Sequence, residues 1–329
     1  MAKQNSISQS RFENSLPTKV WFSAKDATRI VHRLLCGNEK RVPEQKVPVE
    51  YRTRDSFAAN MDPAFTWLGW NTMLIQMSGM AILTDPVLSH RASPTGLWGP
   101  ARLHDVPCGV SDLPDIDVVL ISHDHYDHLD RTTIRALRRT GAAFVVPSGV
   151  GRILRRWGVS AERIHELRWW EDFTIGGITL TATPARHYSG RGLADRYASL
   201  WASWGISDSS HKVFFGGDTG YFDGFSEIAE RLGPFDVTML PIGAYSRYWK
   251  DVHLTPEQAV KVHKDLEGGV LIPIHYATFN LALHDWHEPL VRCLEAAKAQ
   301  SVHVSCPPPG RTVGLDDTVW RSPWWNRPI

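Results

Sequence analysis

The chain has 329 residues, of which 43% are hydrophobic, and its 36 basic and 35 acidic side chains give a formal net charge of +1. A chain of this length can bury a large core, and its near-neutral charge provides no electrostatic basis for a nucleic-acid partner. We find no signal-peptide core in residues 1–17 and no apolar stretch long enough to cross a bilayer, so we predict a cytoplasmic protein.

The first 60 residues differ in character from the rest of the chain. Residues 38–62 are charged and interrupted by prolines, which predicts an extended connector. We therefore expect an N-terminal extension and connector over residues 1–60, followed by one main domain over residues 61–329.

One short helix is predicted inside this extension, over residues 21–35, with Ser23 as its N-cap and an end near Gly37. One side of the helix is apolar and carries Ile30, Val31, Leu34 and Leu35. We expect this side to pack on the domain or on a second copy of the chain, so a homo-oligomer is left open. The alternative is a membrane-surface helix that gives the protein a peripheral membrane contact.

A dense group of metal-ligand side chains follows the apolar run 118–121. The ligand types in this segment are His123, His125, Asp127 and His128. A buried strand that ends in a loop can present such side chains to one ion from several directions. Imidazole and carboxylate without thiolate suit zinc or a similar divalent ion. The alternative is an exposed histidine-rich loop that binds metal adventitiously.

Three further apolar runs also end in ligand-type residues. Residues 179–183 precede His187, residues 213–215 precede Asp218, and residues 270–274 precede His275. The glycines around Asp218 allow a tight turn, which makes this carboxylate a candidate bridging ligand. Because sites of layered α/β proteins form at the carboxyl ends of strands, we expect these four strand ends to converge.

His253 precedes a predicted helix start formed by Thr255, Pro256 and Gln258. From this loop, its side chain can reach a substrate phosphate or protonate a leaving group; the alternative is a structural histidine. We interpret His263, inside the same helix, as a surface residue.

Several aromatic side chains lie near the expected site along the sequence. We expect most of them to be core residues and a subset to line an apolar groove that suits an acyl chain. The candidates for substrate binding are Tyr188, Tyr245, Trp249 and Phe279. Trp324 and Trp325 are interpreted as packing residues.

The segment His123–His128 matches the His-x-His-x-Asp-His motif of the metallo-β-lactamase superfamily, which the chain resembles. Further segments resemble the branch of N-acylphosphatidylethanolamine-hydrolysing phospholipase D: residues 66–69, 83–86, 91–94, 217–221, 233–236, 241–245, 253–259 and 274–275. The resemblance implies an α/β fold, the four-layer αββα sandwich, for the catalytic domain. Trp70 and Asn71 depart from this branch, which usually has a histidine at the first position.

The resemblance also implies how the ligands are shared between two ions. His123, His125 and His187 would hold one Zn²⁺, and Asp127, His128 and His275 the second, with Asp218 bridging. Mn²⁺ and Fe²⁺ are second choices of metal. A hydroxide bridging the two ions would be the nucleophile, oriented by Asp127 as a general base.

The favoured function is a zinc-dependent phosphodiesterase acting on a phospholipid of this type. The alternative is a lactonase or carboxylic-ester hydrolase with a small-molecule substrate at the same binuclear site. We disfavour a redox di-iron enzyme, because enzymes of that kind usually carry Glu where His125 stands. A scaffold protein is disfavoured because all seven ligand positions are filled.

Overall fold

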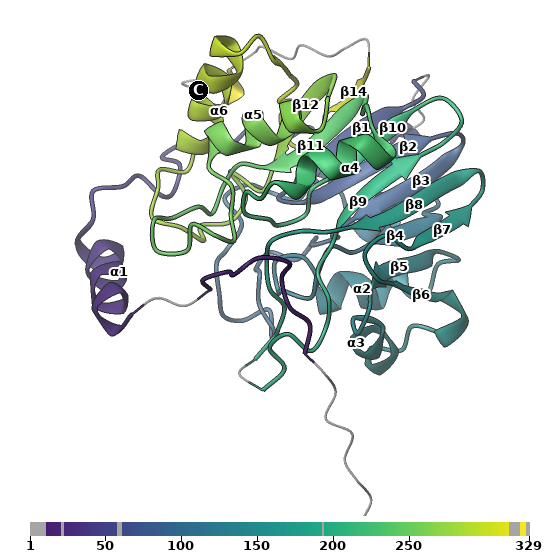
Figure 1. Ribbon diagram of the computed structural model, residues 1–329, viewed down its shortest axis with the longest axis horizontal. Coiled ribbons are helices and arrows are strands. Elements are labelled where there is room, and N and C mark those ends of the chain that lie inside the picture. Colours follow the sequence, from purple (N-terminus) through teal and green to yellow (C-terminus); the bar gives the residue numbers. More distant parts are fainter. Residues whose placement is uncertain (1–10, 21–22, 58–60, 193, 316–322, 327–329) are drawn as a thin grey trace, which may run out of the picture.

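The computed structural model describes residues 11–20, 23–57, 61–192, 194–315 and 323–326 (Figure 1). Within these residues, one sheet holds, in order, β14 (Thr312–Gly314), β1 (Ala64–Gly69), β2 (Thr72–Met77), β3 (Met80–Thr84), β4 (Val118–Leu120), β5 (Ala143–Pro147) and β6 (Ile164–Leu167). Pairing is antiparallel from β14 to β3 and parallel from β3 to β6.

A second mixed sheet packs against the first. It holds, in order, β13 (His303–Val304), β12 (Val270–Ile274), β11 (Val237–Pro241), β10 (Lys212–Phe215), β9 (Ser203–Ser207), β8 (Ile178–Thr183) and β7 (Asp172–Ile175). Because β9 runs antiparallel to both β8 and β10, the strands β8, β10, β11 and β12 point the same way. Their carboxyl ends therefore meet at one edge.

Helices cover the outer faces of both sheets (Figure 1). The α-helices that cover them are α2 (Arg131–Leu137), α3 (Gly151–Arg156), α4 (Gly224–Leu232), α5 (Pro256–Asp265) and α6 (Glu288–Ala299). The short 3₁₀ helices are η1 (Arg54–Phe57), η2 (Val110–Asp112), η3 (Ala161–Arg163) and η4 (Trp324–Asn326). With α2 and α3 on one side and α4 to α6 on the other, the predicted four-layer sandwich is confirmed.

Strand β4 shows how the sequence produces two cores. Alternate side chains of a strand point to opposite faces of the sheet. Val118 and Leu120 accordingly join the core between the sheets, whereas Val119 and Ile121 join the core beneath α2 and α3. All four are fully buried, which is why this run reads as continuously apolar.

The N-terminal helix α1 (Ala24–Cys36) begins and ends as predicted. The Ser23 hydroxyl accepts a hydrogen bond from the amide of Asp26 at 3.1 Å, and Gly37 follows the helix. The helix stands away from the body of the molecule and buries none of its residues, so it does not pack on the domain as expected (Figure 1). Among the described residues, no helix is both long and apolar enough to cross a membrane.

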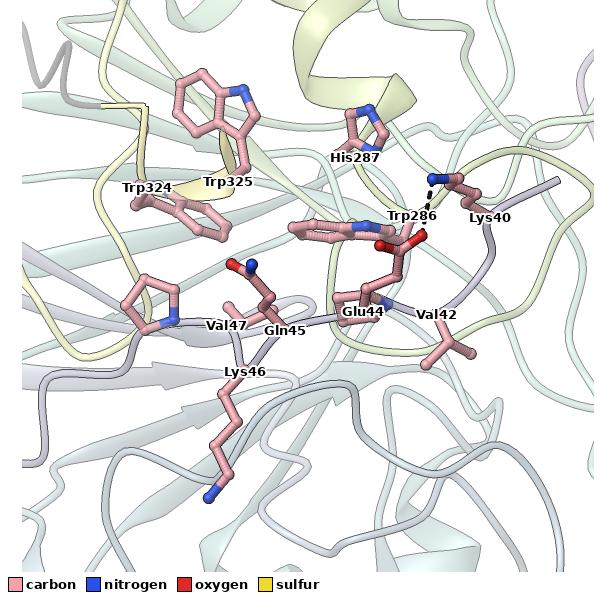
Figure 2. A pocket seen from close by; sticks show the side chains of 12 residues that line it. Lys40, Val42, Glu44, Gln45, Lys46, Val47, Trp286, His287, Trp324 and Trp325 are labelled. Carbon is pink, nitrogen blue, oxygen red and sulfur yellow. Dashed lines mark hydrogen bonds and ion pairs between the residues drawn. The ribbon is translucent and has the colours of Figure 1, made fainter. Parts of the chain in front are cut away.

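The connector lies against two segments from the other end of the chain, and together they form a pocket of about 420 Å³ (Figure 2). Its walls are Lys40 and residues 42–48 with Trp286, His287, Trp324 and Trp325. The prediction that Trp324 packs internally is confirmed, since it is buried and its indole N–H donates to the carbonyl of Cys306 at 2.9 Å.

Candidate metal centre

The ligand loop after β4 is held by Asp85, the residue that follows β3. Its carboxylate accepts hydrogen bonds from the amide and the hydroxyl of Ser122 at 2.7 and 2.6 Å. It also accepts the Nδ1–H of His128 at 2.8 Å, which leaves the Nε2 of that ring free for a metal ion. Asp85 therefore fixes both the start of the loop and the orientation of one predicted ligand.

Three predicted ligands, His123, His125 and His187, form the first group. The Nδ1 of His125 lies 2.8 Å from the Nε2 of His123 and 3.3 Å from the Nε2 of His187. Two nitrogens that share a tetrahedral zinc lie about 3.3 Å apart. The Nδ1–H of His187 donates to the carbonyl of Val252 at 2.8 Å, so its Nε2 faces the group unprotonated.

The second group contains the other predicted ligands, Asp127, His128, Asp218 and His275. The Nε2 of His128 is 3.3 Å from the Nε2 of His275 and 3.4 Å from the Oδ2 of Asp127. Asp218 presents one oxygen to each histidine, at 3.2 Å from His128 and 3.0 Å from His275. Four ligand atoms from three loops thus converge.

Asp218 also faces the first group, because its Oδ2 lies 3.7 Å from the Nε2 of His187. It emerges from β10 through Gly217, whose φ of +56° and contact with the loop exclude a side chain. A Cβ there would lie 2.5 Å from the Cβ of Ser122. The structure thus brings all seven predicted ligands together, with the carboxylate of Asp218 between the two groups.

The electrostatics of these side chains fit divalent cations. Burial lowers the pKa of His123 well below its ordinary value, that of His125 to about 4 and that of His187 to about 3, so these imidazoles are neutral. Burial acts to raise the pKa of Asp218, but His128 and His275 hold it well below its usual range. The imidazoles of the first group are thus in the protonation state that binds a metal. In the second group burial acts to lower the pKa of His128 and His275, but the neighbouring carboxylates raise it, so these two rings would release a proton when an ion binds.

Orphaned buried atoms provide a second test of fit. Among the described residues, the Nδ1 of His253 and the Oδ1 of Asp218 are buried beside the two groups without a hydrogen bond. Buried polar atoms normally have partners, so this concentration at one point indicates a missing ligand. Two divalent ions would satisfy the inward-facing nitrogens and carboxylates.

His253 lies beside both groups, at the start of the segment that leads into α5. The helix begins as predicted, with a capping box between Thr255 and Gln258. The Nδ1 of His253 is 3.8 Å from the Oδ2 of Asp218, and its ring stacks on His275 with centroids 5.4 Å apart. Its side chain is 14% exposed, so it can contact a molecule that enters the site.

A cavity of about 460 Å³ opens beside the centre. Its walls are Ala92, His125, Tyr126, Asp127, Tyr188, Ser189, Gly190, Gly192, Arg196 and Leu281. Burial raises the pKa of Tyr188 to about 12, so its phenol is protonated and can donate a hydrogen bond. The volume and the mixed polar and apolar lining are typical of a small-molecule site.

Of the four aromatic residues predicted to bind substrate, two border a cavity and two form hydrogen bonds within the fold. Tyr188 lies in the cavity wall, and Phe279 borders a smaller hollow with Trp70. The hydroxyl of Tyr245 instead donates to Glu288 at 2.6 Å, and the indole of Trp249 donates to the carbonyl of Ala244 at 2.7 Å. The polar groups of these two residues are therefore engaged within the fold.

The interpretation of His263 as a surface residue is wrong. Its side chain is buried under α5, and its Nδ1 is 2.8 Å from the hydroxyl of Thr238 in β11. A histidine in an amphipathic helix can serve as a core residue when a strand hydroxyl pairs with it, which helical spacing alone does not show.

Asn14 is a residue of the site that the sequence analysis missed. Its side-chain amide donates to the carbonyl of His187 at 2.7 Å and accepts from the amide of His187 at 3.1 Å. We call residues 11–20 the N-terminal strap, because they run across the loops that carry His187 and Asp251. Further contacts join the strap to Arg186, Tyr197 and Asp251.

The fold and the site together define a hydrolase of the metallo-β-lactamase superfamily. The model of the Beta-lactamase superfamily domain matches residues 81–276, so the chain belongs to this family. The predicted family is confirmed. In this family context, the two groups of histidines and aspartates identify a metal-dependent hydrolase.

Two relatives and one solved structure show which members of the family the chain resembles. The chain is 36% identical to N-acyl-phosphatidylethanolamine-hydrolyzing phospholipase D 1 of Caenorhabditis elegans, over 88% of this chain and 87% of the relative. It is 47% identical to an uncharacterized protein of Mycobacterium tuberculosis, over 80% of this chain and 72% of the relative. The solved structure of Igni18, a metallo hydrolase from Ignicoccus hospitalis, matches with a TM-score of 0.59 and 25% identity, over 76% of this chain and 97% of that one.

Proposed function

We propose that the protein is a binuclear zinc-dependent phosphodiesterase that hydrolyses phospholipids of the N-acylphosphatidylethanolamine type. The observation that carries this proposal is the position of the Asp218 carboxylate, which faces His187 on one side and His128 and His275 on the other. The C. elegans relative, named for that activity, supports the substrate class.

Zinc is the proposed metal because the ligand set consists of imidazoles and carboxylates. His123, His125 and His187 supply three nitrogens to one position, and Asp127, His128 and His275 supply the other. Zinc favours such sites with an open position for water or substrate. When bound, two such ions would produce a nucleophile from water at neutral pH and neutralise charge developing on a phosphoryl oxygen.

The protein's own side chains would orient the substrate. Asp127 lines the cavity, and its carboxylate accepts a hydrogen bond from the attacking water. His253, whose pKa burial lowers to about 3, is neutral and donates its N–H to a phosphate oxygen. Full turnover in an Asp127→Asn variant that keeps both ions would contradict the role of Asp127.

The helix α1 would bring the site to a lipid surface. Its apolar side leaves Val31, Leu34 and Leu35 exposed at 53%, 43% and 79%, and Arg33 ties the helix to the carbonyl of Leu283 at 3.1 Å. The nearby Leu281 lines the catalytic cavity. Leu35→Glu should weaken sedimentation with phospholipid vesicles several-fold, with Leu97→Glu as the control for an equally exposed leucine outside α1.

The activity test combines elemental analysis with four substrates: an N-acyl phospholipid, bis-p-nitrophenyl phosphate, a p-nitrophenyl ester and a lactone. We expect two zinc ions per chain and diesterase activity that Asp218→Ala abolishes. Asp115→Ala, which removes the exposed partner of Arg54, is the matched control and should be fully active. Turnover of the ester or lactone alone would replace the phosphodiesterase with the alternative hydrolase.

A further inference from the structure

The turn between β1 and β2 contains two residues, Trp70 and Asn71, and both face the candidate metal centre. The indole N–H of Trp70 donates to the Oδ2 of Asp127 at 3.1 Å. The side-chain amide nitrogen of Asn71 lies 3.3 Å from the Nδ1 of His128. A hairpin turn that carries none of the predicted ligands therefore contacts two ligands of the second group.

The backbone of Trp70 is held in an uncommon conformation. Its φ is +55°, in the left-handed region that bulky residues rarely occupy. Its amide donates to the hydroxyl of Thr278 at 2.8 Å, and its carbonyl accepts the amide of His275 at 3.0 Å and the indole N–H of Trp67 at 2.9 Å. Such strain persists where the surroundings determine the conformation, and it is concentrated at functional sites.

The ring of Trp70 lies against a ligand that has no other anchor for its outer nitrogen. The Nδ1 of His123 contacts Ser122, that of His128 donates to Asp85 and that of His187 donates to a carbonyl. Within the described part of the chain, the Nδ1 of His275 has no such partner. Instead, the indole of Trp70 packs on the imidazole of His275, with ring centroids 3.9 Å apart.

We propose that Trp70 is a positioning residue for the second metal ion. Its N–H fixes the rotation of the Asp127 carboxylate, a torsion with only broad intrinsic preferences, and its ring fixes the imidazole plane of His275. One side chain thereby aligns two ligands from different sheets before the ion binds. The inference rests on the proposed binuclear centre and assigns a role that none of the seven ligands can fill.

The two contacts of Trp70 can be separated by substitution. Trp70→Phe removes the donor to Asp127 and keeps an aromatic ring beside His275, whereas Trp70→Leu removes both. Trp324→Phe is the matched control, because it also removes a buried indole donor to an oxygen, the carbonyl of Cys306, away from the centre. All three proteins are compared after metal removal, by thermal unfolding, to establish that each one folds.

The readouts are metal affinity, by competition with a chromogenic chelator, and the visible spectrum of the cobalt-loaded protein, both without substrate. We expect Trp70→Phe to raise the dissociation constant of the ion held by the second group about tenfold and to shift the cobalt bands. Trp70→Leu should raise the same dissociation constant about a hundredfold. Trp324→Phe should match the wild type in both readouts. If Trp70→Leu does not fold, Trp70→Phe decides the test alone.

The outcomes separate this inference from the proposed function. Two ions bound with wild-type affinity and an unchanged cobalt spectrum in the Trp70 variants would overturn the positioning role and leave the phosphodiesterase proposal standing. Weaker metal binding and a shifted cobalt spectrum in the Trp70 variants, with no diesterase activity in the wild type, would support the positioning role and overturn the phosphodiesterase proposal. A wild-type chain that binds fewer than two ions would overturn both.

Discussion

The two sheets contribute to the candidate metal centre in different ways. The first sheet supplies four ligands from a single loop, His123 to His128, directly after β4. The second supplies His187, Asp218 and His275 from the ends of three strands, β8, β10 and β12. One contribution is a local motif, and the other exists only once the sheet has formed.

The supports of the two contributions differ accordingly. Asp85 anchors the first loop at Ser122 and at His128. In the second sheet, each ligand has a separate support: the carbonyl of Val252 for His187, Gly217 for Asp218 and the ring of Trp70 for His275. A single mutation in the second sheet should therefore displace one ligand and leave the other two in place.

The largest effect is expected where the two contributions meet, at Asp218. Asp218→Ala removes the carboxylate that faces both groups, so we expect loss of at least one ion and a fall in kcat/KM of about 10³-fold or more. Elemental analysis and steady-state kinetics measure the two effects. Two retained ions with kcat/KM reduced less than tenfold would show that the carboxylate is not a bridge.

The next prediction compares the metal content of two variants, each of which lacks one ligand from a different group. His123→Ala and His275→Ala should each leave about one ion per chain, because each removes a ligand from one group only. Elemental analysis after gel filtration gives the stoichiometry. Loss of both ions in both variants would show that the two positions fill as a single unit.

A smaller effect is expected from the support of the first loop. Asp85→Asn places an amide where the Nδ1–H of His128 donates, so we expect metal affinity to fall about 10- to 100-fold. Asp117→Asn is the control, because the carboxylate of Asp117 accepts the amide of Ala81 at the opposite end of β3. Equal metal affinities in the two variants would show that Asp85 does not support the metal ligands.

The smallest effect is expected at the N-terminal strap. Asn14→Ala removes the amide that contacts His187 twice, and we expect metal affinity to fall about fivefold, equivalent to about 1 kcal/mol. Thr18→Ala is the control, since Thr18 contacts Arg186 and not a ligand. An unchanged affinity in Asn14→Ala would show that the strap covers the site without shaping it.

The sequence predicts the strand ends well, because an apolar run followed by a ligand-type side chain is a local signal. The predicted runs before His187, Asp218 and His275 coincide within one or two residues with β8, β10 and β12. Asp85 follows a similar run, β3, and the same rule applied to a single carboxylate would have singled it out.

Other features depend on contacts that no local pattern contains. His263 is buried because β11 places Thr238 beneath it, 25 positions away in the chain. The hydroxyl of Tyr245 is hydrogen-bonded within the fold because α6 places Glu288 and Arg292 beside it. Such pairings follow from how the helices pack on the sheet, and helix periodicity gives only the face that is buried.

The N-terminal strap gives the order of synthesis a role in completing the site. Asn14 leaves the ribosome first, yet its partner His187 lies 173 positions further on, about 10 to 30 s later during translation. The interval is longer for Lys19, whose partner Asp251 lies 232 positions further along the chain. The strap is thus made long before the loops that it contacts, and it can close over them only after they have been synthesised.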